Sequence, residues 1–195
     1  KHKARLVVKG FQQKKGINFD EIFAPVVKMT SNQVILGLAT SMNLELEQID
    51  VKTALLCGDL KAEIYMQQPE GFEVSSQNLV CKLSKSLYGL KQAPRQLNKK
   101  FDSFMQSQGY KKTTADKCVY IKKYSNRAFI VHLLYVDVML IVLNDPRKDK
   151  STKERTSNSF DMKDLGKAQQ ILGMQITRDQ DKDKLWLSQE KYIER

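Results

Sequence analysis

Two aspartates, Asp50 and Asp137, lie at positions where a carboxylate could bind a metal ion. Asp50 lies near the end of the alternating segment LELEQIDV, and Asp137 interrupts the apolar run LLYVDVMLIV. Burying an ionised carboxylate among apolar residues is costly unless a cation or hydrogen-bond donors compensate it. Carboxylates that converge from neighbouring strand ends can hold Mg²⁺, a hard cation that prefers oxygen ligands. From spacing alone, the alternative is that each aspartate only satisfies the backbone of a turn.

Phosphoryl transfer with two metal ions sets a stricter requirement. Two Mg²⁺ ions about 3.5–4 Å apart stabilise the attacking and leaving oxygens of an in-line displacement. Such a site needs at least three carboxylates, because each ion requires anionic ligands and one ligand must bridge them. Asp50 and Asp137 supply only two.

Basic residues outnumber acidic ones and are unevenly distributed along the chain. The 195 residues include 33 Lys and Arg against 22 Asp and Glu, a formal net charge of +11. Residues 1–30 carry a net charge of +5 and residues 82–123 one of +9, whereas residues 44–75 carry −5. This distribution predicts a groove for a polyanion, most simply nucleic acid held through its phosphates. A merely soluble basic protein is the alternative.

The rest of the composition narrows the class of protein. Three cysteines and two histidines show no metal-ligand spacing, and an odd cysteine count fits a reducing compartment. The apolar run 129–143 is too short and too interrupted to span a membrane. We therefore expect an intracellular chain, cytoplasmic or nuclear, that is neither secreted nor bound to a membrane. Both ends look cut, so we also expect a fragment of a longer protein.

Hydrophobic periodicity predicts an α+β fold in which an antiparallel sheet is backed by helices. The expected helices are 30–43 and 94–108, and the expected strands are 3–8, 44–51, 79–83, 118–123, 129–143, 170–179 and 184–189. The run 129–143 is long enough to be a hairpin that bends near Val136 and Asp137. His132 and Trp186 are expected to be packed inside.

Two segments carry more detailed expectations. In residues 30–43, Thr30 and Gln33 have the spacing of a capping box. The expected buried stripe of this helix is Val34, Ile35, Leu38 and Ala39. Residues 147–159 contain no apolar residue, so they should form either a solvated loop or a helix that has lost its core-facing residues.

Long segments, in order along the whole chain, resemble the reverse transcriptase domain of copia-type retrotransposon Pol polyproteins. They are KARLVVKGFQQKKGINFDEIFAPV, QIDVKTALL, GDLKAEIYMQQPEGF, VCKLSKSLYGLKQAPRQ, LLYVDVMLIV and LGMQI followed by WLSQEKYI. The resemblance implies an RNA-directed DNA polymerase with a right-hand fold. Fingers would comprise approximately residues 1–27 and 60–92, and the palm 28–59 and 93–195; the thumb and RNase H would be missing.

The resemblance implies that Asp50 and Asp137 hold two Mg²⁺ ions, to which Val51 would offer its backbone carbonyl. The family's usual Tyr-Val-Asp-Asp ends here in Val138, so the second aspartate is missing. Valine offers no oxygen ligand, and water would not replace the lost negative charge. We therefore expect weakened Mg²⁺ binding and an inactive or impaired enzyme.

Further departures from the family's pattern agree with this expectation. Leu55 stands where the family usually has a Phe under the nucleotide sugar, so discrimination against a 2′-hydroxyl should be looser. Leu97 and Asn98 replace a usual Trp-Tyr pair, and residues 147–159 fall where the family has an amphipathic palm helix. These departures indicate relaxed selection on this copy.

The resemblance also assigns binding roles. Lys3 and Arg5 would reach the incoming triphosphate, because a guanidinium suits phosphate oxygens; a solvated strand face is the alternative. The other assigned residues are Gly89, Lys91 and Gln92 for the nucleotide, and Arg95, Leu172, Gly173 and Met174 for the primer–template. The last three would otherwise be a plain structural hairpin.

The expected partners follow from these roles. They are an RNA or DNA primer–template, dNTPs and the remainder of a Pol polyprotein with integrase and RNase H. The alternative function is a non-catalytic nucleic-acid-binding remnant of the polymerase, and a third possibility is a relic that barely folds.

Overall fold

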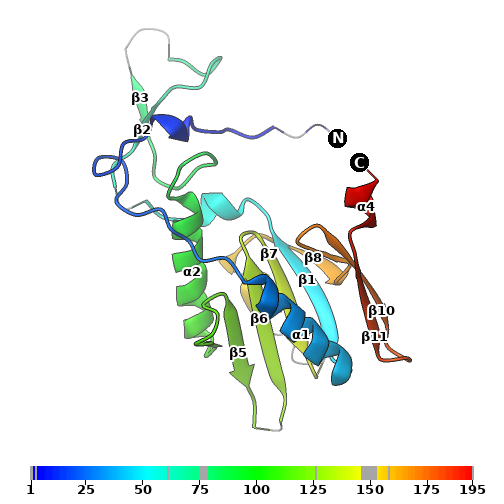
Figure 1. Ribbon diagram of the computed structural model, residues 1–195. Helices are drawn as coiled ribbons and strands as arrows, with labels where there is room; N and C mark the ends of the chain where they lie inside the picture. Colours follow the sequence, from blue (N-terminus) through cyan, green and yellow to red (C-terminus); the bar gives the residue numbers. More distant parts are fainter. Residues whose placement is uncertain are drawn as a thin grey trace. The chain divides into compact units, whose positions relative to one another are not determined.

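The chain folds as two units. The computed structural model describes residue 2 and residues 4–60, 62–74, 79–125, 127–145, 153–157 and 159–194. Unit 1 consists of Lys1–Ala24 and Thr53–Phe104, and unit 2 of Pro25–Lys52 and Met105–Arg195. Figure 1 shows the elements of both.

Unit 2 is built on an antiparallel sheet of order β4-β5-β6-β7-β1-β8. Its strands are β1 Glu45–Val51, β4 Lys111–Lys112, β5 Val119–Lys123, β6 Phe129–Tyr135, β7 Val138–Leu143 and β8 Met162–Lys167. A smaller sheet consists of β9 Gln170–Ile171, β10 Met174–Asp179 and β11 Lys184–Ser188. Helix α1, Met29–Ser41, lies across the first sheet (Figure 1), and α4 is Glu190–Ile193. This architecture confirms the predicted mixed class with antiparallel sheets.

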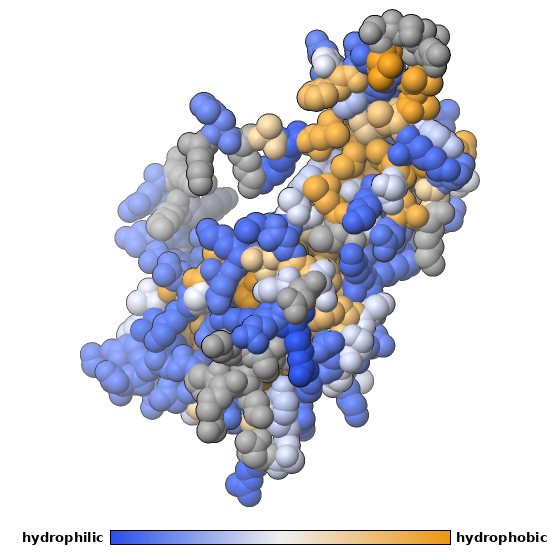
Figure 2. Space-filling view, turned by 180° about the vertical axis from the view of Figure 1, so that it is seen from behind, coloured by the Kyte–Doolittle hydropathy of each residue, from blue (hydrophilic) through white to orange (hydrophobic). Residues whose placement is uncertain are grey.

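Unit 1 consists of short elements around a small apolar core. They are 3₁₀ helices at Gly10–Gln12 and Ala54–Cys57, strand β2 Tyr65–Gln67, strand β3 Val80–Lys82 and helix α2 Ala93–Ser107, whose last turn belongs to unit 2. The strand expected at residues 3–8 is wrong, because Val7 makes only an isolated bridge with Tyr88. Figure 2 shows apolar side chains gathered over the β2–β3 part of this unit, where Phe72 is 80% exposed.

Helix α1 buries a stripe that only partly matches the predicted one, since Ala39 is buried and Ile35 is partly buried as expected. Asn32, Leu36 and Ala39 are buried, whereas Val34 and Leu38 are 60% and 46% exposed. Apolar residues occupy more than one side of this helix, so periodicity alone could not determine which side is buried. The Asn32 side-chain amide has no hydrogen-bond partner among the residues that the structure describes. Leaving a buried amide unpaired costs about 1–3 kcal/mol.

The N-terminus of α1 is capped from a distant segment. The expected capping box is wrong, because Lys28 is the N-cap residue and makes no side-chain capping bond. Instead, the Asp116 carboxylate accepts hydrogen bonds from the Lys28 N–H, at 2.8 Å, and the Ser31 hydroxyl, at 2.6 Å. Burial raises the pKa of Asp116, but these hydrogen bonds outweigh it and lower the pKa below its ordinary value. A carboxylate here also complements the helix dipole.

Strands β6 and β7 form the predicted hairpin and lie at the centre of the sheet. Most of their residues are buried, because side chains on both faces are covered. His132 is packed inside, as expected: its Nδ1 lies 2.7 Å from Met139 Sδ, and its Nε2 lies 3.2 Å from the Tyr110 hydroxyl. Burial lowers the pKa of His132 to about 3, so the imidazole is neutral in the folded chain.

Two other expectations concern the C-terminal part. Residues 153–157 are helical and Thr156 is buried, which supports a helix without apolar core-facing residues; residues 147–152 and 158 lie outside the described residues. Trp186, expected in the core, is 48% exposed because it lies on β11, an edge strand. None of the helices that the structure describes has the length and apolar character required to cross a bilayer.

The buried imidazole predicts a pH dependence of stability. In the unfolded chain His132 takes up a proton below about pH 6.5, whereas the folded chain resists protonation down to about pH 3. Stability is therefore lost as the pH falls from about 6.5 toward 3, by about 1.4 kcal/mol per pH unit. Urea unfolding at pH 7 and pH 5 should show a loss about 2 kcal/mol smaller in His132→Leu than in the unmodified chain.

Exposed His2 provides the matched control. His2→Leu should keep the full pH dependence of the unmodified chain. Equal losses in the His132→Leu and His2→Leu variants would contradict a neutral, buried His132.

Candidate functional site

Asp137 lies at the tip of the β6–β7 hairpin. Val136 and Asp137 form a two-residue turn between Tyr135 and Val138. Val136 has a φ of +53°, a left-handed conformation that is unfavourable for a β-branched residue. The tight turn leaves the Asp137 side chain exposed at the end of two otherwise buried strands. The backbone thus presents this carboxylate at some conformational cost.

Asp50 reaches the same end of the sheet from β1. In the antiparallel β1–β7 pair Asp50 stands opposite Val138, and the Val51 N–H donates to the Asp137 carbonyl at 2.8 Å. Side chains alternate along β1, so Asp50 shares a face with Gln48. Gln48 and Asp137 both line one cavity of about 400 Å³ on the α1 side of the sheet. Asp50 and Asp137 therefore lie on the same face of the sheet and at the same end of its strands.

Val138 occupies the position between these groups. Its Cα pairs with Asp50 on one side and with Tyr135 on the other. Directly opposed residues have Cβ atoms about 4.5–5.5 Å apart, so a carboxylate at position 138 would lie beside that of Asp50. Among the described residues, no group of three or more His, Cys, Asp or Glu side chains could hold a metal ion. The residues present fit the ligand chemistry of a hard cation but supply only a partial set.

The predicted primer hairpin borders the same cavity. Leu172 and Gly173 form the turn between β9 and β10, and both line the cavity together with Asp137. Met174 begins β10 and is not one of the lining residues. The structure therefore brings two of the three residues predicted for this hairpin to the cavity of the candidate site.

Unit 1 holds the residues assigned to the nucleotide, with Lys3 outside the described residues. Gly89 has a φ of +93°, and a Cβ built on it would lie 2.0 Å from the Val8 carbonyl oxygen. The Val8 N–H in turn donates to the Tyr88 carbonyl at 2.8 Å. The close approach that Gly89 permits is thus to the backbone of the chain itself. Arg5 lies over the Tyr88 ring, with its guanidinium carbon 5.6 Å from the ring centroid.

Lys91 and Gln92 bind the loop that contains Gln13 and Asn18. The Lys91 N–H donates to Gln13 Oε1 at 2.8 Å, and Gln13 Nε2 donates to Gln92 Oε1 at 3.0 Å. Gln92 Nε2 donates to the Asn18 carbonyl at 3.2 Å. Both polar atoms of the buried Gln92 amide therefore have partners inside unit 1. No local motif in the sequence indicated the linking role of Gln13.

Arg95 and Leu55 also make internal contacts in unit 1. The Arg95 guanidinium donates to the Phe23 carbonyl at 2.9 Å and forms an ion pair with Glu21. Leu55 is partly buried and packs against the unit's apolar core. These contacts stabilise unit 1; the nucleotide and primer–template roles remain predictions.

Comparison with known proteins identifies the family. The profile described as "Reverse transcriptase (RNA-dependent DNA polymerase)" matches residues 1–195. The chain belongs to this reverse transcriptase family. It is similar to "Retrovirus-related Pol polyprotein from transposon TNT 1-94" of Nicotiana tabacum, with 67% identity over 100% of this chain and 15% of the relative.

A second relative has a similar arrangement. "Retrovirus-related Pol polyprotein from transposon RE1" of Arabidopsis thaliana is 37% identical over 99% of this chain and 13% of its own length. The reverse transcriptase chain thus spans only a small part of the Pol polyproteins that it matches. No solved structure matches it.

The candidate site has a further neighbouring residue that the sequence did not reveal. Lys163 on β8 stands opposite Asp50, so Asp50 has Val138 on one side and Lys163 on the other. Strand β8 was not predicted, because its sequence MKDLGK lacks an apolar alternation.

Gly89 gives a direct test of the unit 1 backbone. Gly89→Ala should destabilise unit 1 by several kcal/mol, because the new Cβ would overlap the Val8 carbonyl. Gly71→Ala is the matched control, since Gly71 also has a positive φ, +80°, but no atom within 4 Å of a built Cβ. It should cost only about 1 kcal/mol. Comparable losses for both variants in urea unfolding would contradict the close approach at Gly89.

Proposed function

We propose that this chain is the fingers and palm of an RNA-directed DNA polymerase whose activity is lost or severely lowered by Val138. The single observation that carries the proposal is the register that sets Val138 directly beside Asp50 at the hairpin holding Asp137. In this proposal unit 1 contributes the fingers and unit 2 the palm. The substrates would be dNTPs and an RNA or DNA primer–template.

Three oxygen donors of this chain would bind divalent metal: the carboxylates of Asp50 and Asp137 and the backbone carbonyl of Val51. A bound Mg²⁺ ion would favour deprotonation of the primer 3′-hydroxyl and stabilise charge on the phosphoryl oxygens. Val138 contributes neither an oxygen nor a negative charge, so the affinity for a second ion would fall. Lys163, opposite Asp50, adds a positive charge beside the remaining carboxylates.

The other assigned residues would bind substrate. Leu172 and Gly173 border the cavity that contains Asp137, which supports a role at the primer end. Arg5 and Lys91 would contact the nucleotide phosphates, and Leu55 would leave a 2′-hydroxyl less strictly excluded. The net charge of +11 supports phosphate contact along the template.

Restoring the missing carboxylate tests the proposal. Val138→Asp should bind Mn²⁺ roughly tenfold more tightly than the unmodified chain, a difference of about 1.4 kcal/mol. On a poly(A)–oligo(dT) template the unmodified chain should incorporate no more dTTP than Asp137→Asn. Electron paramagnetic resonance of free Mn²⁺ measures the affinity, and primer extension measures the activity.

Val138→Asn is the matched control, because it has nearly the same shape as aspartate without the charge. It should gain little affinity. Robust incorporation by the unmodified chain, lost in Asp137→Asn, would refute the loss of activity. Salt-dependent binding to primer–template without extension in any variant would favour the alternative, a nucleic-acid-binding remnant.

A further inference from the structure

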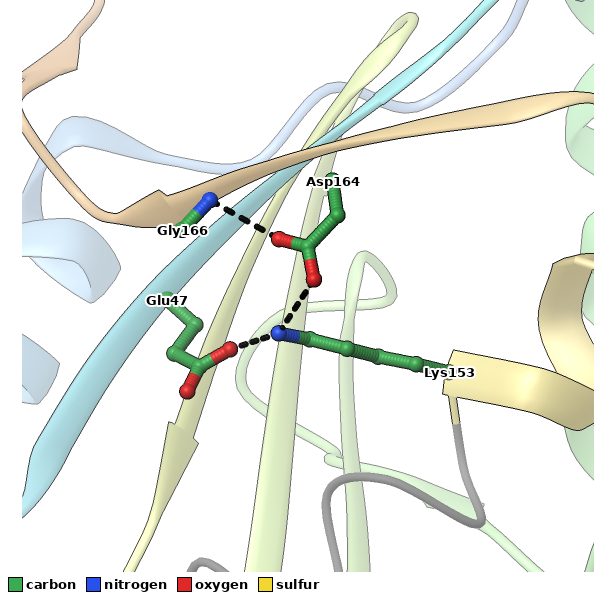
Figure 3. Close-up of polar contacts among 4 residues, drawn as sticks. All are labelled: Glu47, Lys153, Asp164 and Gly166. Carbon is green, nitrogen blue, oxygen red and sulfur yellow. Dashed lines mark hydrogen bonds and ion pairs between the residues drawn. The ribbon is translucent and has the colours of Figure 1, made fainter.

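The polar helix 153–157 is attached to the six-stranded sheet of unit 2 through a lysine. Figure 3 shows the Lys153 ammonium between the carboxylates of Glu47, on β1, and Asp164, on β8. Its Nζ donates to Asp164 Oδ2 at 2.9 Å and also to Glu47. The Lys153 and Glu47 side chains are only 16% and 22% exposed. Charges so far removed from water require partners, and each of these groups has them.

Asp164 also holds an irregularity in β8. Its second carboxylate oxygen accepts a hydrogen bond from the Gly166 N–H at 2.8 Å (Figure 3). Gly166 has a φ of +71°, which side-chain-bearing residues rarely adopt. Burial raises the pKa of Asp164, but the hydrogen bonds from Lys153 and Gly166 outweigh it and lower the pKa. The ionised Asp164 carboxylate thus links the Lys153 ammonium to the backbone at Gly166.

This irregularity is a β-bulge that sets the register of β8 on β1. Ile49 stands opposite Asp164 and Gln48 opposite Gly166, so Leu165 is the extra residue. The register beyond the bulge places Lys163 opposite Asp50. A slip by one residue would move every β8 side chain to the other face.

Strand β8 has little else to specify its register. It is an edge strand, and five of its six residues are exposed. Edge strands without a buried apolar face are prone to slippage. The bulge and the ion pairs of Lys153, which we call the Lys153 clamp, supply the specific contacts that the apolar pattern lacks.

We propose that Lys153 is a positioning residue that, through the β1–β8 register, holds Lys163 beside the ion site of Asp50 and Asp137. Side chains alternate along β1, so Glu47 lies on the face opposite Asp50 and the clamp acts from the back of the sheet. The inference deepens the proposed function and, in its effect on ion binding, rests on it. A register that keeps the positive charge of Lys163 beside Asp50 opposes cation binding there, because like charges repel.

Substitution of Lys153 tests both steps in the Val138→Asp background. Lys153→Met should abolish the nuclear Overhauser contacts between Asp50 and Lys163 that report the register. It should also strengthen Mn²⁺ binding several-fold, because the positive charge of Lys163 no longer stands opposite Asp50. The affinity is measured at a temperature where every variant is folded. Lys153→Arg should keep the contacts and bind Mn²⁺ within about twofold of the parent, because the positive charge remains. A merely structural role would lower the melting temperature but leave the affinity of the folded chain unchanged.

Two further variants keep the test decisive. Lys182→Met is the matched control: Lys182 is 70% exposed and forms an ion pair with Asp179, and its loss should change neither readout. Glu47→Gln/Lys153→Met removes the clamp without leaving Glu47 as an unpaired charge, should Lys153→Met alone not fold. It should give the same loss of contacts and the same gain in affinity.

The outcomes separate the two proposals. Intact Asp50–Lys163 contacts in the clamp variants would overturn the inference, whatever the metal affinity. Lost contacts with unchanged Mn²⁺ affinity would overturn the effect on the ion site. If the Val138→Asp parent binds Mn²⁺ no better than Asp137→Asn in the same background, the proposed function fails, and the contacts alone decide the role of the clamp in register.

Discussion

The antiparallel pairing of β1 with β7 is the constraint on which the candidate site depends. Both strands lie inside the six-stranded sheet, and β7 is buried over most of its length. A shift of one residue would move every side chain of the shifted strand to the other face and break the packing around the buried β7 residues, so burial holds the register firmly. That register brings Asp50 to the tip of the β6–β7 hairpin and sets position 138 beside it. The core fixes where position 138 lies, and the side chain at that position then determines how many carboxylates stand beside Asp50.

Unit 2 also buries polar side chains, both in its sheet and in its helices. Asn32, His132 and Thr156 are each at most 2% exposed. His132 has two polar neighbours, whereas the Asn32 amide has no partner among the described residues. The unpaired amide is a penalty of about 1–3 kcal/mol, a large part of the stability of an ordinary domain. Burial of β6 and β7 on both faces is the apolar contribution that offsets it.

Periodic segments could be predicted from the sequence, but contacts between distant segments could not. Strand β1, the β6–β7 hairpin and helix α2 each have an apolar pattern that is typical either of a strand or of a helix. All three were predicted. The N-terminal cap of α1 is a carboxylate 88 residues away from Lys28, so no local motif could indicate it. Strand β8 forms through a bulge and an ion pair rather than an apolar pattern. For the site, the aspartates could be named in advance, but Lys163 beside Asp50 required the register of a strand that the sequence conceals.

The matched motifs differ in what they say about function. Gln92 and Arg95 make hydrogen bonds that hold unit 1 together, and Gly89 is required by a backbone crossing. A chain that no longer bound nucleotides would still need these residues to fold, so their presence is weak evidence for retained catalysis. Val138 is different, because in the proposed function a carboxylate at this position would serve to bind metal beside Asp50. Position 138 is therefore the informative one for the proposed activity.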